Sequence, residues 1–299
     1  MPPAAPFRYQ AFGLTFQSML PLPELREGAG EGVADVVVSL GPAPRPIDRV
    51  QPVVANVVAG PDLFWMDVPG TARLLVRDAR EIAVEPYPDA REGDIRAYLL
   101  GSAIGALLHQ RGWLPLHASA VEIDGRAVAF IAPSGGGKST IAMHLHHRGH
   151  RVICDDICAI DVQAGGARLW PGLRNLKLWR TSLAAIDATP DALEPVLASL
   201  DKYRFPITAL ADYRAYDLRA VVLLAWGDEP ELVALSGAEA VGALIANTFR
   251  GQLVAPMARA AEHWRQCLAT FQAAGVHRLT RQRALDRLDA ASDLVTRLP

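Results

Sequence analysis

The chain has 299 residues, 51% of them hydrophobic, so it can bury a sizeable core in one large domain or two ordinary ones. Its 30 basic and 32 acidic residues nearly cancel, which argues against nucleic acid or an anionic membrane surface as the main partner. Three cysteines without a C-x-x-C pair fit poorly with a disulfide framework. The amino terminus resembles no secretory signal, and no apolar run approaches the roughly 18 residues of a membrane span, so we expect a cytoplasmic protein.

The first part of the chain has the pattern of strands and turns. The run "ADVVVSLG" is a short β-rich segment, and "LFWMDVPGTARLLVRDAREIAVEP" alternates apolar and polar residues around the turn signal Pro69-Gly70. The segment "EPYPDAREGD" then breaks the pattern. We therefore predict a β-rich amino-terminal region over residues 1–90.

The remainder, residues 91–299, alternates helical and strand patterns, which indicates an α/β domain. A helix is expected from Asp94 to just before Gly112, followed by two strands joined by the hairpin signal Asp124-Gly125. Further predicted elements are the helix "KSTIAMHLHHRG", the buried strands "RVICDDICAI" and "VVLLAW", and a mostly helical tail from Gly237.

The stretch Ala132–Thr140, "APSGGGKST", nearly matches the phosphate-binding pattern G-x-x-x-x-G-K-[ST], with Ala132 at the position of the first glycine. An apolar strand precedes this glycine loop and a helix follows it, which is the context that phosphate binding needs. Lys138 would reach the β- and γ-phosphates of ATP, and the Ser139 hydroxyl would bind Mg²⁺. The bland alternative is a glycine-rich turn before an ordinary helix. The predicted ATP-binding residues are Ser134, Gly135, Gly136, Gly137, Lys138, Ser139 and Thr140.

Two adjacent carboxylates, Asp155 and Asp156, lie 17 and 18 residues after Lys138, at the end of the next predicted strand. Neighbouring residues on a strand face opposite ways, so different roles are expected for them. One would hold Mg²⁺ and the other would accept a proton from an attacking hydroxyl. The alternative is a solvated turn. His117, 21 residues before Lys138, is by itself more often structural than catalytic.

Together these pieces resemble a known family. The run from His117 to Ile160 is similar to the catalytic core of bacterial HPr kinase/phosphorylases, on the pieces "LHASAVEIDG", "APSGGGKST", "HRGHRV" and "CDDI". The resemblance implies a P-loop kinase domain of the HPr kinase type that phosphorylates a protein serine with ATP and Mg²⁺. It assigns phosphate binding to Lys138, metal binding to Ser139 and Asp155, and the catalytic base to Asp156, assisted by His117 and Asp155.

The chain departs from that family in one motif. The family's glutamate–arginine–glycine signature supplies a further metal ligand, whereas the corresponding stretch here, "WPGLRNLKLWRTSL", contains no carboxylate. A second metal ligand and the reverse phosphorylase activity are therefore not carried over by the resemblance.

Softer motifs along most of the chain resemble the HPr-kinase-like enzymes of lasso peptide gene clusters. They are "YQAFGLTFQSMLPLPEL", "PGLRNLKLWRTSLAAI", "LDKYRFP" and "NTFRGQL". This resemblance implies a peptide partner, such as a lasso precursor with a carboxyl-terminal acceptor serine. Lys177, Lys202, Arg204 and Arg250 are candidate ligands for phosphate or for the peptide carboxylate, each with a solvated surface cation as the alternative.

Three other functions stay open at this point: an HPr-type kinase that regulates carbon metabolism, a non-catalytic nucleotide-binding module, and an ATPase that drives a conformational change. A homo-oligomer is also compatible with the sequence.

Overall fold

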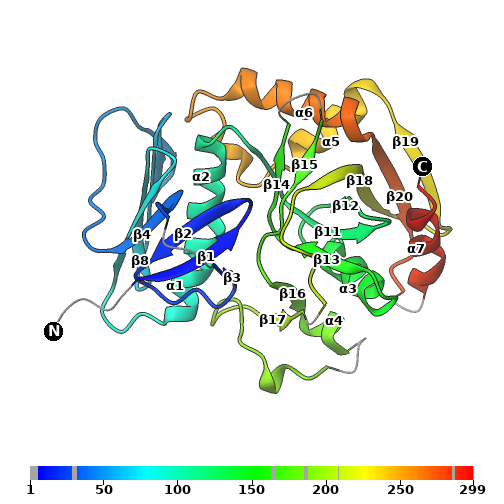
Figure 1. Cartoon of the computed structure of the whole chain (residues 1–299), viewed down its shortest axis with the longest axis horizontal. Coiled ribbons are helices and arrows are strands. Elements are labelled where there is room, and N and C mark those ends of the chain that lie inside the picture. Colours follow the sequence, from blue (N-terminus) through cyan, green and yellow to red (C-terminus); the bar gives the residue numbers. More distant parts are fainter. Residues whose placement is uncertain are drawn as a thin grey trace. The chain divides into compact units, whose positions relative to one another are not determined.

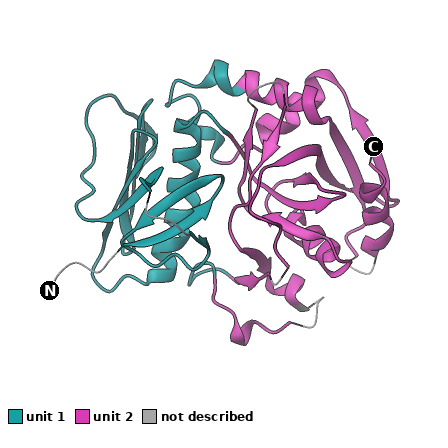
Figure 2. Cartoon of the chain, in the orientation of Figure 1, with its two compact units in different colours: residues 1–113, 196–200, 250–263 teal, residues 114–195, 201–249, 264–299 magenta. Residues whose placement is uncertain are grey.

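The computed structural model describes residues 6–28, 32–162, 166–184, 188–207, 209–284 and 287–298. The chain forms two compact units, which Figure 2 distinguishes by colour. Their bounds differ from the predicted division at residue 90: unit 1 comprises residues 1–113, 196–200 and 250–263, and unit 2 comprises residues 114–195, 201–249 and 264–299. The difference arises because the helix expected to open the second region packs against the sheet of unit 1.

Unit 1 is built on a nine-stranded sheet with the order β3-β1-β2-β4-β9-β8-β7-β6-β5. The antiparallel meander predicted around Pro69-Gly70 is present as β7, β8 and β9. The strands are β1 (Phe7–Ala11), β2 (Leu14–Ser18), β3 (Arg26–Glu27), β4 (Val36–Leu40), β5 (Gln51–Val54), β6 (Val57–Ala59), β7 (Leu63–Val68), β8 (Ala72–Arg77) and β9 (Glu81–Pro86).

The predicted long helix is present in three consecutive segments, α1 (Glu92–Tyr98), a π-helical stretch (Leu99–Ala103) and α2 (Ile104–Gln110). Its apolar side chains are buried, and both the π-helical stretch and α2 contact β8. This helix therefore supplies the core of unit 1 on one face of its sheet (Figure 1). A short 3₁₀ helix at Gly251–Leu253 also belongs to this unit.

Unit 2 contains a mixed sheet with the order β10-β14-β15-β18-β12-β11-β13, extended beside β18 by β20 and β19. The predicted hairpin at Asp124-Gly125 is confirmed, because β11 and β12 pair in antiparallel register around it. The strands are β10 (Leu114–Leu116), β11 (Ala118–Ile123), β12 (Arg126–Ile131), β13 (Arg151–Cys154), β14 (Cys158–Asp161), β15 (Arg168–Leu169), β18 (Tyr216–Trp226), β19 (Glu231–Leu235) and β20 (Val276–Arg281).

Helices cover both faces of this sheet. One buried cluster joins Val128 and Phe130 of β12 to α3 (Lys138–His147) and α7 (Leu288–Thr296). The other joins Ala129 and Ile131 of the same strand to α5 (Gly237–Ala246) and to the part of α6 (Ala260–Ala274) that lies in unit 2. Because both faces are covered, β12 is apolar and buried from Ala127 to Ile131, after the exposed Arg126. The predicted α/β class is confirmed in this mixed architecture.

A two-stranded ribbon in unit 2 consists of β16 (Asn175–Trp179) and β17 (Lys202–Pro206). Leu176 and Leu178 of β16 are buried in the same cluster as α3, which holds the ribbon against that helix. The short helix α4 (Arg180–Ala184) follows β16 directly, and a 3₁₀ turn spans Pro190–Ala192.

The expectation of a mostly helical tail from Gly237 is wrong for β20. Its sequence "VHRLTR" has few apolar residues and no clean alternation, so nothing local marks it as a strand. Its position comes from pairing with β18 in parallel and with β19 in antiparallel fashion. Since β12 also pairs with β18 in parallel, the carboxyl ends of β12, β18 and β20 lie at one edge of the sheet, where ligands of open α/β sheets bind.

Among the described residues, no helix is both long enough and apolar enough to cross a bilayer.

Candidate functional site

The glycine loop connects the end of β12 to the first turn of α3. Gly137 precedes α3 with φ of 84°, a left-handed backbone conformation that favours glycine. Lys138 folds back over the loop, where its Nζ donates to the carbonyl oxygens of Ala132 (2.8 Å) and Pro133 (3.3 Å). Burial lowers the pKa of Lys138 to about 8, although Asp155 acts in the opposite direction. The loop thus places a buried ammonium beside a helix amino terminus, an arrangement that attracts phosphate.

Ala132 is compatible with the loop, although it replaces the first glycine of the pattern. It is buried and is not among the residues with positive φ, so its methyl group adds no backbone strain. The methyl group does restrict a neighbour, because a Cβ at Gly136 would lie 2.5 Å from the Cβ of Ala132. With alanine at position 132, the loop therefore needs glycine at position 136.

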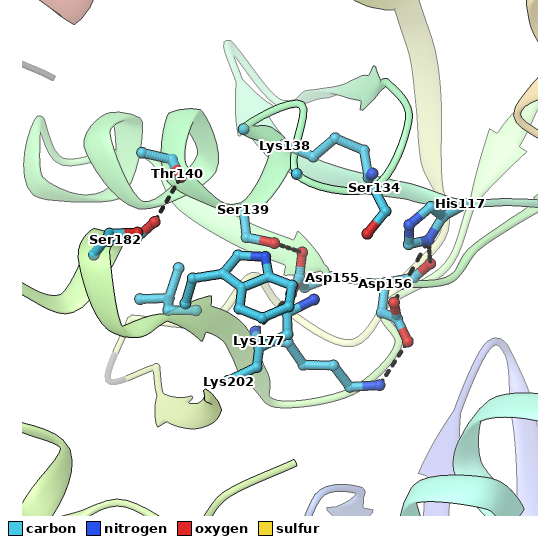
Figure 3. Close-up of a pocket in the computed structure, with 15 residues that line it drawn as sticks. His117, Ser134, Lys138, Ser139, Thr140, Asp155, Asp156, Lys177, Ser182 and Lys202 are labelled. Carbon is cyan, nitrogen blue, oxygen red and sulfur yellow. Dashed lines mark hydrogen bonds and ion pairs between the residues drawn. The ribbon is translucent and has the colours of Figure 1, made fainter. Parts of the chain in front are cut away.

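Asp155 is the central hydrogen-bond acceptor of the site. Its carboxylate is only 2% exposed and accepts from the Ser119 hydroxyl (2.5 Å), the Ser139 hydroxyl (2.9 Å) and the backbone amide of Lys177 (2.7 Å). These donors belong to β11, to the first turn of α3 and to β16. Figure 3 shows Ser139 and Asp155 pointing toward each other. The carboxylate therefore joins three elements around the glycine loop.

Asp156 has a different environment from its neighbour, as predicted for two adjacent residues. Its backbone is left-handed, with φ of 70°, and its carboxylate forms an ion pair with Lys177 Nζ at 2.5 Å. His117 Nδ1 lies 3.5 Å from Asp156 Oδ1 and 3.1 Å from the Asp156 carbonyl oxygen. The alternative of a solvated turn is thus wrong, because both carboxylates are buried or paired with other side chains.

The charges around Asp156 determine its ionisation. Burial by itself would raise the pKa of Asp156, but Lys177 and then His117 lower it far below the usual aspartate range. Burial also lowers the pKa of His117, an effect that outweighs the opposing charge of Asp156. At neutral pH the site therefore holds an ionised Asp156 beside a neutral imidazole, and both can accept a hydrogen bond or a proton.

A cavity of about 120 Å³ opens between these groups. Its floor is the glycine loop, and its walls include the ribbon, where Lys202 Nζ lies 5.6 Å from the ring centre of Trp179. The structure brings most of the predicted site residues to this cavity: His117, Ser134, Gly135, Gly137, Lys138, Ser139, Thr140, Asp155, Asp156, Lys177 and Lys202.

Three predicted residues are placed elsewhere. Gly136 lines a neighbouring cavity on the same loop. Arg204 is buried, with its guanidinium 3.3 Å from a Glu194 carboxylate oxygen and donating to the Pro195 carbonyl (2.8 Å), so its charge stabilises the fold around β17 rather than lining this cavity. Arg250 belongs to unit 1, where it donates to the Ser102 hydroxyl at 2.7 Å, and its role as an anion ligand stays a prediction.

Sequence reasoning missed other cavity residues. Trp179, Thr181 and Ser182 line the cavity, and the Ser182 hydroxyl lies 3.2 Å from that of Thr140. All three fall in the segment "KLWRTS", directly after Lys177. Their signal in the sequence is that they follow the predicted ligand Lys177 within five residues.

The oxygen atoms of Ser139 and Asp155 fit the predicted magnesium site. Mg²⁺ in phosphoryl-transfer sites uses one or two protein oxygens and completes its shell with phosphate oxygens and water. The hydroxyl of Ser139 and the carboxylate of Asp155 face the cavity beside the loop and lie within 2.9 Å of each other. Within the described part of the chain, no group of three or more His, Cys, Asp or Glu side chains forms a larger metal site.

Comparison with known proteins gives little beyond this geometry. No protein-family model matches the chain, and no curated protein matches it. Among solved structures, the chain is similar to the Hpr(Ser) kinase/phosphatase from Coxiella burnetii, with 11% identity and a TM-score of 0.31. The match covers 62% of this chain and 92% of the other. At that TM-score no conclusion rests on the likeness.

The contact between Ala132 and Gly136 predicts a coupled pair of substitutions. Gly136→Ala should lower the free energy of unfolding by about 1–3 kcal/mol, because the new methyl group would overlap that of Ala132. Adding Ala132→Gly should recover part of this loss. Denaturant unfolding of the wild type, both single variants and the double variant gives the coupling energy. Additivity of the two effects within about 0.3 kcal/mol would contradict the contact.

The low pKa of Lys138 predicts that nucleotide binding weakens at alkaline pH. As the pH rises through about 8, the free protein loses the Lys138 proton and with it the attraction for phosphate. The Kd of ADP, measured by calorimetry between pH 7 and pH 10, should therefore increase above about pH 8. Lys138→Arg keeps its charge over this range and should give weaker but pH-independent binding. A wild-type Kd of ADP that does not change with pH would refute the role of Lys138 in phosphate binding.

Proposed function

We propose that the chain is an ATP- and Mg²⁺-dependent serine kinase with a P-loop kinase domain of the HPr kinase type. The observation that carries this proposal is the position of Asp156 and His117, which face the same cavity as Lys138 and the glycine loop. Binding a nucleotide requires only the loop and its lysine. A carboxylate and a neutral imidazole beside them are what a kinase needs to orient and deprotonate an acceptor hydroxyl.

In the proposed reaction the acceptor serine oxygen forms a bond to the γ-phosphorus, and the bond from that phosphorus to the β–γ bridging oxygen breaks. ADP leaves, and the hydroxyl proton passes to Asp156. Lys138 and the loop amides neutralise charge on the phosphates, and His117 steadies the Asp156 carboxylate. Mg²⁺, held by Ser139 and Asp155, would supply further neutralisation of the phosphate oxygens when bound.

The ion pair between Lys177 and Asp156 controls how strong a base Asp156 is in this reaction. While Lys177 stays on the carboxylate, the low pKa of Asp156 makes it a weak base. Phosphate in the cavity competes for the same ammonium group. As Lys177 moves toward phosphate, the pKa of Asp156 rises, so the base gains strength when the nucleotide is in place.

For the acceptor, we propose a peptide or small protein, in the first instance a lasso peptide precursor that ends in serine. The support is the sequence resemblance together with Lys202, whose ammonium lies over Trp179 at the cavity. A lysine there can pair with the carboxylate that immediately follows a carboxyl-terminal serine. An HPr protein is the alternative acceptor.

Substitution of Asp156 separates catalysis from binding. Asp156→Asn keeps the side-chain size and tolerates the left-handed backbone, but it cannot accept the proton. Phosphoryl transfer measured by mass spectrometry should fall by about 10²–10⁴-fold, while ADP should bind at least as tightly as it does to the wild type, because Lys177 is released toward phosphate. Asp217→Asn, which alters an exposed carboxylate in the same unit, is the control and should retain full transfer. Normal transfer by Asp156→Asn would exclude Asp156 as the base.

A panel of acceptors tests the substrate. The protein with Mg-ATP is incubated with a precursor peptide ending in serine, the same peptide ending in alanine, and an HPr protein. One added phosphoryl group on the serine-ending peptide alone is the expected result. Phosphate on HPr would assign the metabolic function instead. ATP hydrolysis without any acceptor would indicate an ATPase, and binding without turnover would indicate a nucleotide-binding module.

A further inference from the structure

A second cavity lies against the glycine loop, outside the group of His117, Asp155 and Asp156. Its volume is about 610 Å³, within the range of small-molecule sites. It shares Ser134, Gly135 and Gly137 with the first cavity, so one loop borders both spaces. The side chains that distinguish it are Trp226 and Arg281, the last residues of β18 and β20, together with Arg283 and Leu224.

Arg281 is a buried cation without an acidic partner among the described residues. It is only 2% exposed, and its Nε has no hydrogen-bond partner. Its Nη2 donates to the Gly136 carbonyl at 3.2 Å and lies so close to Gly137 that a Cβ there would collide with it. Burial lowers the pKa of Arg281 to about 10, and none of the described carboxylates forms an ion pair with it. A buried guanidinium of this kind is stabilised by an anionic ligand.

Trp226 provides a flat aromatic surface beside this cation. The two residues are paired in register at the ends of parallel strands, and the Arg281 guanidinium carbon lies 4.3 Å from the indole ring centre. Arg283 approaches the same ring at 5.2 Å. Trp226 is 41% exposed and lines the second cavity, so part of its side chain is open to a ligand there. Nucleobases stack on tryptophan and on guanidinium groups.

We propose that Trp226, Arg281 and Arg283 bind the nucleoside half of the nucleotide. The base stacks on Trp226 and Arg283, and the charge of Arg281 attracts the phosphate next to the ribose. The terminal phosphates then extend along the glycine loop into the first cavity, where the γ-phosphate meets the acceptor serine. This inference rests on the proposed function, because it requires that the loop binds a nucleotide.

Calorimetry with two probes tests the inference in the full-length protein. The probes are ADP and inorganic tripolyphosphate, each in the presence of Mg²⁺, since both contain the phosphates but only ADP contains a base. Trp226→Ala should weaken ADP binding by about tenfold, the loss expected for one stacked base. The same variant should bind tripolyphosphate within about twofold of the wild type. Trp226 is partly exposed, so its replacement should leave the fold intact.

Trp264→Ala is the matched control, because Trp264 is also exposed, lies on α6 and lines neither cavity. It should bind both probes as the wild type does. Unchanged ADP binding by Trp226→Ala, or an equal loss in Trp264→Ala, would overturn the nucleoside site while leaving the kinase proposal standing. A wild-type protein that binds neither probe would overturn the proposed function, and this inference with it.

Discussion

The carboxylate of Asp155 joins three separate parts of the candidate site, and the positions of Ser139 and Lys177 depend on it. Its oxygens accept from Ser119, Ser139 and the amide of Lys177, which lie far apart in the sequence. Because this carboxylate is buried, the loss of any of these donors would weaken its stabilisation. Its contact with the Lys177 amide holds β16 where the Lys177 ammonium reaches Asp156. The structural role of one aspartate therefore determines the electrostatics of the next.

The sequence was informative where local patterns determine the structure. A hairpin dipeptide, an apolar strand and a glycine loop before a helix are short-range signals, and β11, β12 and α3 follow them. The aspartate pair and His117 were located by spacing, and the structure places them at one cavity. Different roles for the two carboxylates followed from strand alternation. In the structure the two carboxylates diverge because Asp156 has a left-handed backbone.

Tertiary effects account for what the sequence did not predict. β20 is a strand because β18 and β19 pair with it, and its own residues have no strand pattern, so Arg281 could not be connected with the glycine loop in advance. Arg204 has the positive charge expected of an anion ligand, but the Glu194 carboxylate pairs with it. The boundary predicted at residue 90 followed a composition break, whereas packing places the next helix in unit 1. In each case the deciding contact joins segments that are distant in the chain.

The left-handed backbone at Asp156 also limits how this protein can evolve. Among residues with a side chain, asparagine and aspartate adopt this conformation most readily, and bulky or β-branched residues do so at a cost. Glutamate, the other carboxylate, has a longer side chain and would displace the charge from Lys177. Asparagine and glycine are thus the substitutions that this backbone conformation tolerates best at position 156. Asparagine at position 156 would keep the same backbone turn while removing the negative charge that faces Lys177.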